Sequence, residues 1–139
     1  RAIHDEFGAY DPVHTINNAA ACVAALVLGA GDFHRSVTFS VMCGWDTDCN
    51  SGNVGCLMGI KNGLAGIDAG PDWRTPVADR LYLPTADPGT AVTDAATQTY
   101  HLVNIARASR GLRPVHPNGG MRYHFALPGS LQGFVPENS

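Results

Sequence analysis

The feature that most constrains the fold is a segment in which small residues recur at helical spacing. Four glycines follow one another at intervals of three or four residues: Gly52, Gly55, Gly59 and Gly63. The apolar residues between them, beginning at Val54, also follow helical spacing. Each glycine inside a helix costs about 1 kcal/mol relative to alanine. The pattern therefore predicts a helix over residues 53–64 against which another helix packs very closely.

Length and composition indicate one folded domain. The chain has 139 residues, of which 45% are hydrophobic and 15% are charged, and this balance is typical of globular proteins. The formal net charge is −3, with eight arginines and one lysine. Because these charges create no strong positive electrostatic potential, we expect no nucleic-acid partner.

The longest apolar run covers residues 19–28 and is about half of the ~20 residues that span a bilayer. We therefore expect a buried helix and no membrane partner. Asn17 or Asn18 is predicted to cap this helix, and Gly29 and Gly31 to end it. The start of the chain shows no secretory signal pattern.

Further boundaries follow from capping and turn residues. Asp32 is predicted to cap a helix over residues 33–43, and Thr93 or Asp94 a helix over residues 95–110. A helix start is predicted at residues 72–76, a loop at residues 84–89 and a short extended piece at residues 121–127.

The cysteines indicate a reducing environment. All four lie in small-residue helical contexts: Cys22, Cys43, Cys49 and Cys56. This setting favours free thiols over disulfides, and we expect a cytoplasmic protein.

Two carboxylates, Asp46 and Asp48, lie between an apolar segment and the glycine-rich segment. Hard dications such as Mg2+ or Mn2+ prefer oxygen ligands, and an Asp-x-Asp at the start of a helix offers two on one side of a turn. The same pair can instead simply cap the following helix. Spacing alone leaves both interpretations open.

Other chemistries at this motif fit less well. A calcium loop of the EF-hand type would need glycine where Ser51 lies and a bidentate glutamate where Leu57 lies. Zinc would use the cysteines, but no Cys-x-x-Cys pair is present. Cys49 falls in the first turn of a helix, where we expect a lowered thiol pKa. Since no sequence feature nominates a base for it, we interpret it as a small helix residue.

Several motifs together resemble a known family. They are residues 14–19 (His-Thr-Ile-Asn-Asn-Ala), Asp32-Phe33, residues 41–50 with the sequence Gly-Trp-Asp-Thr-Asp-Cys-Asn at their end, Gly59, Gly63 and Trp73. These segments resemble the C-terminal part of the ADP-ribosylglycohydrolase family, which includes the dinitrogenase-reductase-activating glycohydrolase. The resemblance covers residues 14–80 well and the remainder loosely.

The resemblance implies an all-α fold, an orthogonal helical bundle of the ADP-ribosylglycohydrolase type. Residues 1–114 would form the C-terminal portion of this helical domain. Residues 115–139 would be an irregular or β-like tail that begins or contacts another element. No segment before residue 14 resembles the family's first metal motif, so we expect the N-terminal part of the same protein to be a partner.

The resemblance also implies a binuclear Mg2+ site, with Mn2+ as an alternative. Asp46 and Asp48 would be metal ligands, and Cys49 falls at the position of the family's threonine ligand. The expected reaction is hydrolysis of the glycosidic bond of an ADP-ribosylated protein or a small ADP-ribose derivative. The alternative is an inactive family member that binds ADP-ribose or has a structural role.

Three further residues are candidate substrate contacts on the same basis: Trp45, Asn50 and His14. The indole of Trp45 could stack on adenine or ribose, or fill the core. No general base is nominated, so the catalytic residues stay unassigned.

Overall fold

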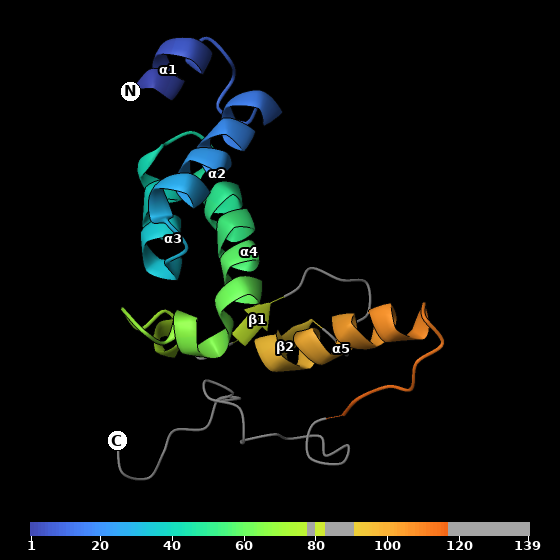
Figure 1. Cartoon of the computed structure of the whole chain (residues 1–139). Coiled ribbons are helices and arrows are strands. Elements are labelled where there is room, and N and C mark those ends of the chain that lie inside the picture. Colours follow the sequence, from blue (N-terminus) through green and yellow to red (C-terminus); the bar gives the residue numbers. More distant parts are fainter. Residues whose placement is uncertain (78–79, 83–90, 117–139) are drawn as a thin grey trace. The chain divides into compact units, whose positions relative to one another are not determined.

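The computed structural model describes residues 1–77, 80–82 and 91–116, and Figure 1 shows the chain. It divides into two compact units, residues 1–71 and residues 72–139. Most described residues are helical, and a two-stranded sheet supplies the described strands. This content confirms the predicted all-α class.

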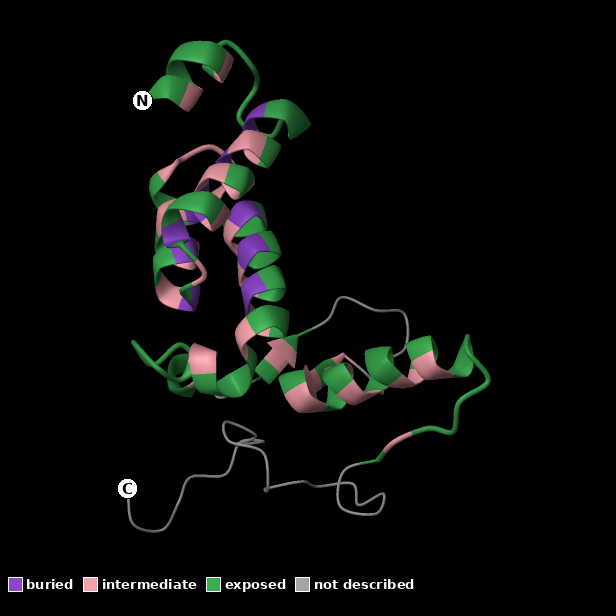
Figure 2. Cartoon of the chain, in the orientation of Figure 1, coloured by how far each residue is buried: buried purple, intermediate pink, exposed green. Residues whose placement is uncertain are grey.

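The first unit contains four helices: α1 (Ala2–Phe7), α2 (Thr15–Gly29), α3 (Phe33–Met42) and α4 (Thr47–Ile67). The helices α2, α3 and α4 pack against one another. Their small core contains Ala25, Phe33, Val54 and Met58. Figure 2 shows buried positions, coloured purple, on these three helices. Three helices thus share one core, and the Asp-x-Asp motif lies at the start of the third, with Asp46 as N-cap and Asp48 in the first turn of α4.

The start of α2 differs from the prediction. His14, not an asparagine, is the N-cap, because its Nδ1 accepts a hydrogen bond from the backbone N–H of Ile16 at 3.2 Å. Asn17 and Asn18 lie inside the first turn, where their amides make longer-range contacts. By contrast, Asp32 caps α3 as predicted, since its Oδ1 accepts from the backbone N–H of Arg35 at 2.7 Å.

The glycine-rich helix also differs from the prediction. It begins at Thr47 instead of residue 53, and Gly63 adopts φ 64° and ψ −172°, which interrupts the helical geometry. A Cβ atom added at Gly52 would meet no atom within 4 Å, and one at Gly59 would meet Ile67 Cδ1 at an ordinary 3.6 Å. At Gly55 an added Cβ would meet Val37 Cγ2 of α3 at 3.8 Å, which is also an ordinary contact. Within the described residues, therefore, no helix approaches these glycines closely enough to exclude a side chain.

The close approach lies at Gly29 instead. An added Cβ there would lie 2.8 Å from Ser36 Cα, a distance that real Cβ atoms do not show. Ser36 is fully buried on α3. Glycine at the end of α2 is thus required for α2 and α3 to pack together.

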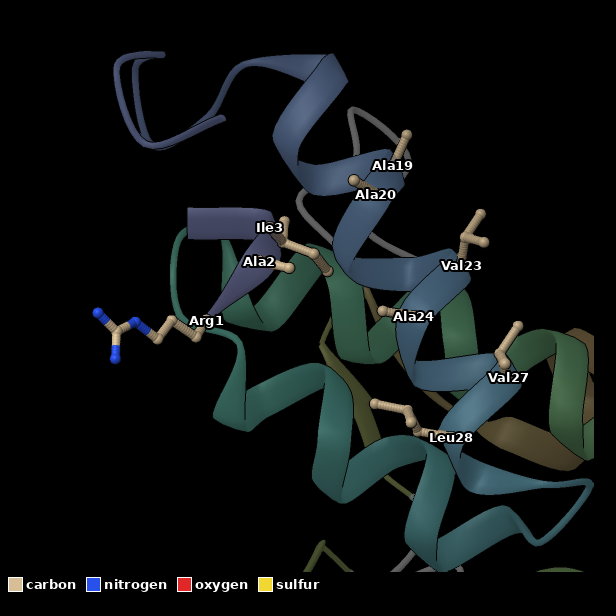
Figure 3. A pocket seen from close by; sticks show the side chains of 9 residues that line it. All are labelled: Arg1, Ala2, Ile3, Ala19, Ala20, Val23, Ala24, Val27 and Leu28. Carbon is tan, nitrogen blue, oxygen red and sulfur yellow. The ribbon is translucent and has the colours of Figure 1, made fainter. Parts of the chain in front are cut away.

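The apolar run in α2 is only partly buried. Ala21 and Ala25 are fully buried, but Val23 is 61% exposed and Val27 is 70% exposed. The exposed side contributes to a shallow groove of about 670 Å³, which is completed by the N-terminal residues, including Ile3 (Figure 3). The prediction of a wholly buried helix is wrong because one face of α2 has no cover within the described residues. None of the described helices is long and apolar enough to cross a membrane.

The second unit contains η1 (Thr75–Val77), β1 (Arg80–Tyr82), β2 (Val92–Asp94) and α5 (Ala95–Ala108). The two strands pair antiparallel, with Arg80 opposite Asp94. These strands were not predicted. The cap of α5 is confirmed, because Asp94 Oδ1 accepts a hydrogen bond from the backbone N–H of Thr97 at 2.8 Å.

The helix start predicted at residues 72–76 is the short η1. Asp72 Oδ1 accepts hydrogen bonds from the backbone N–H groups of Arg74 and Thr75 at 3.1 and 2.9 Å. The predicted loop at residues 84–89 and the extended piece at residues 121–127 lie outside the described residues.

Candidate metal-binding site

The turn between α3 and α4 reverses the chain with two consecutive left-handed residues. Gly44 has φ 77° and Trp45 has φ 57°. A left-handed conformation costs a residue with a Cβ roughly 1–2 kcal/mol, so surrounding contacts must hold Trp45 in place. One such contact is a stacking interaction with His4, whose ring centroid lies 4.0 Å away at an interplanar angle of 12°. His4 Nε2 also lies 2.8 Å from the carbonyl oxygen of Cys43.

The N-cap and the first turn of α4 present Asp46, Asp48 and Cys49 together. One ligand atom from each side chain lies within 4.8 Å of the others. Asp46 is half-buried, whereas Asp48 and Cys49 are exposed. In the described part of the chain, no other group of three or more His, Cys, Asp or Glu side chains is placed to hold a metal ion. The sequence motif is therefore a real cluster in space.

An asparagine on α2 holds this turn. Asn18 Oδ1 accepts a hydrogen bond from the backbone N–H of Asp46 at 3.2 Å and another from Asn50 Nδ2 at 2.8 Å. The Nδ2 of Asn18 donates to the carbonyl oxygens of Pro12 at 2.7 Å and His14 at 2.9 Å. Asn18 thus ties the segment before α2 to the first turn of α4.

Asn50 completes the connection from inside the helix bundle. It is 1% exposed, and its Oδ1 accepts a 3.5 Å hydrogen bond from the thiol of Cys22. Asn17, which precedes Asn18 on α2, is also fully buried, and its Nδ2 donates a hydrogen bond to the carbonyl oxygen of Asp11 at 3.2 Å. Buried amides need such partners, since an unsatisfied polar group costs about 1–3 kcal/mol.

The cluster shifts the pKa values of two members. A hydrogen bond with the Asp46 side chain, followed by hydrogen bonds from the backbone N–H groups of Asp48 and Cys49, lowers the pKa of the Asp48 carboxyl. The Asp46 carboxylate accepts a hydrogen bond from the Cys49 thiol and, together with its charge, raises the pKa of Cys49. The expected lowering of the Cys49 pKa is therefore wrong, because the hydrogen bond to the Asp46 carboxylate and the charges of Asp46 and Asp48 favour the neutral thiol.

The predicted substrate contacts have different surroundings. Trp45 is half-buried and stacks on His4. Asn50 uses its amide within the fold, in the contacts with Asn18 and Cys22. His14 is exposed, caps α2 and lies 4.7 Å from the ring of Tyr10. The substrate role of all three remains a prediction.

Sequence reasoning missed His4 and Asn18 as residues that position the turn. The paired Asn17-Asn18 at a helix start was visible but was interpreted as a cap. No local pattern marks His4, since its contacts are with Cys43 and Trp45, about forty residues away in the sequence.

Comparison with protein-family models gives a match to ADP-ribosylglycohydrolase over residues 1–114. The chain belongs to the ADP-ribosylglycohydrolase family. No curated protein matches it, and no solved structure matches it. The matched region includes the whole Asp46, Asp48 and Cys49 cluster.

The side chains of this family member's cluster fit the expected Mg2+ only in part. The carboxylates of Asp46 and Asp48 are the oxygen ligands that Mg2+ prefers. The thiol of Cys49, which shares their space, is a soft ligand and a poor one for a hard cation. The donor set is therefore mixed, with two hard ligands and one soft ligand.

Proposed function

We propose that this chain carries the C-terminal half of the cation site of a hydrolase that cleaves the glycosidic bond of ADP-ribosylated substrates. Membership of the family supports a glycohydrolase in general. The observation that carries the specific proposal is the pair of carboxylates, Asp46 and Asp48, held together at the start of α4. We further propose a cytoplasmic location, which the four free cysteines support.

The residues of the chain have separate roles in this proposal. Asp46 and Asp48 would hold a divalent cation, which when bound orients ribose hydroxyls and stabilises developing charge. Asn18 and Asn50 would fix the position of Asp46 by their hydrogen bonds. The face of Trp45 that is not against His4 would contact the nucleotide or ribose. The family resemblance makes Mg2+ or Mn2+ the first cations to test.

Titration calorimetry with Mn2+ and Mg2+ tests the cation site. We expect weak binding that Asp46→Asn or Asp48→Asn reduces at least about tenfold, because each variant removes one anionic ligand. Asp5→Asn is the matched control, because Asp5 is an exposed carboxylate whose ion pair is with Arg1 at 3.8 Å. Equal binding in all four proteins would refute the site and leave Asp46 and Asp48 as carboxylates at the start of α4 without a role in cation binding.

The reaction is tested separately. ADP-ribosylated protein and small ADP-ribose derivatives should release ADP-ribose in a cation-dependent reaction that requires Asp46 and Asp48. The partner expected to complete the site is the N-terminal part of the same protein, so the assay includes it. Binding of ADP-ribose without release would instead support the second candidate, an inactive binding member of the family. The soft Cys49 in the donor set favours that candidate.

A further inference from the structure

The chemistry of the cluster bears on which cation it takes. Cys49 Sγ lies within 4.8 Å of a carboxylate oxygen of both Asp46 and Asp48. Bonds from a zinc-class cation to sulfur and oxygen are about 2.3 and 2.0–2.2 Å long, so three ligands around one ion lie roughly 3.5–4 Å apart. The three ligand atoms of the cluster, all within 4.8 Å of one another, lie close to that spacing.

The soft ligand decides between classes of cation. Mg2+ takes oxygen ligands and retains water, whereas thiolates select Zn2+ and similar ions. We propose that Cys49 is a third ligand and that the Asp46, Asp48 and Cys49 cluster prefers a thiophilic dication of the Zn2+ class to Mg2+. This inference rests on the proposed cation site, and it replaces the identity of the cation expected from the family.

Accessibility agrees with this role. Cys49 and Asp48 are exposed and Asp46 is half-buried, so an ion can reach all three side chains without an opening of the helix bundle. On binding, the cation forms a bond to Sγ, the S–H bond breaks and its proton passes to the solvent. No oxidation or reduction takes place.

A second thiol on the same helix gives a matched control. Cys56 is free and exposed, and it lies seven residues after Cys49 on α4. Within the described residues it is not part of a group that could hold a metal ion. Cys49→Ser and Cys56→Ser therefore make the same chemical change at positions that differ in their carboxylate neighbours.

The test is a titration of the whole chain with Co2+, an absorbing substitute for Zn2+, under a reductant that contains no thiol. We expect a thiolate-to-cobalt charge-transfer band that Cys49→Ser abolishes and Cys56→Ser retains. Affinity for Co2+ and Zn2+ should fall at least about tenfold in Cys49→Ser, with Mg2+ affinity retained. Since most sites bind Co2+ more tightly than Mg2+, the comparison between variants decides the question, not the ranking of metals.

The other outcomes separate the two proposals. Co2+ binding that depends on Asp46 and Asp48 but lacks the charge-transfer band would overturn the thiol ligand and leave the proposed cation site intact. A band that follows Cys56 would also overturn the inference. No binding dependent on Asp46 or Asp48 would overturn both proposals.

A measurement on the unaltered chain guards against misfolded variants. Zn2+ should slow alkylation of Cys49 by iodoacetamide and leave Cys56 unchanged, because a coordinated thiolate is a poor nucleophile. Equal rates at Cys49 with and without saturating Zn2+ would overturn the inference.

Discussion

The side-chain oxygen of Asn18 lies 2.8 Å from Asn50 Nδ2 and accepts a second hydrogen bond from the backbone of Asp46. One amide therefore connects α2 to both the turn that carries the candidate ligands and the helix that follows it. The backbone of the candidate ligand Asp46 is held by a contact that is distant in sequence, and this relationship can be tested by substitution.

Asn18→Ala should lower the free energy of unfolding by about 1–3 kcal/mol, because it leaves the buried amide of Asn50 without that partner. It should also weaken Mn2+ binding, since Asp46 loses the contact that fixes its backbone. Chemical denaturation and calorimetry measure the two effects. Asn53→Ala, at an exposed position on α4, is the control. It should leave Mn2+ binding unchanged and should not lower the free energy of unfolding, because alanine favours the helix more than asparagine does.

A pH prediction follows from Asp72 at the start of η1. Hydrogen bonds from the side chain and backbone of Thr75 lower the pKa of the Asp72 carboxyl, with a smaller contribution from the nearby charge of Arg74. The pKa is depressed in the folded state, so its stabilising effect is present above the unfolded-state pKa. That effect is lost as the pH falls through the folded-state pKa.

Carboxyl-resonance titration by NMR should thus give Asp72 a pKa below its ordinary value. Thr75→Val removes the hydroxyl, the largest cause, and retains the backbone N–H that donates at 2.9 Å. The Asp72 pKa should rise in this variant without reaching its ordinary value. An unchanged titration would show that the hydroxyl does not act on Asp72.

Local signals in the sequence predicted some boundaries well. Asp32 was expected to cap α3, and Thr93 or Asp94 to cap α5. Asp32 and Asp94 do so, each through a bond to a backbone N–H three residues later. The position of Asp46 and Asp48 at the start of a helix was also visible from their order in the chain. These features depend on neighbours within a few residues.

Features set by distant contacts were not predicted. Asn18 meets residues 28 and 32 positions away, and neither partner could be inferred from helical spacing. The strands β1 and β2 are three residues each, too short to show alternation. The glycine spacing was visible but its cause was misassigned, because the required close contact lies at Gly29 and not along α4.

The contrast between Gly29 and Gly52 gives a third prediction. Gly29→Ala places a Cβ 2.8 Å from Ser36 Cα, so α2 and α3 must move apart, and stability should fall by about 1–3 kcal/mol. Gly52→Ala meets no atom within 4 Å and removes a flexible residue from α4, so it should raise stability by up to about 1 kcal/mol. Thermal or denaturant unfolding of the two variants measures whether each substitution raises or lowers the free energy of unfolding. Equal effects would contradict the close approach of α2 and α3.

The stack of His4 on Trp45 gives a fourth prediction. The two rings lie 4.0 Å apart and nearly parallel, and they join α1 to the turn before α4. A double-mutant cycle with His4→Ala and Trp45→Ala should give a coupling energy of about 0.5–1.5 kcal/mol, which is typical of aromatic pairs.

Trp45 fluorescence, measured with Trp73→Phe to remove the second indole, provides a separate check of this contact. His4→Ala exposes one face of the Trp45 ring to water, so the emission should shift to longer wavelength. His101→Ala, at an exposed position of α5 in the other unit, should leave the emission unchanged. A coupling energy near zero together with an unshifted emission would contradict the stack. The turn that presents Asp46 and Asp48 would then be held by the Asn18 contacts and the hydrogen-bonded backbone alone.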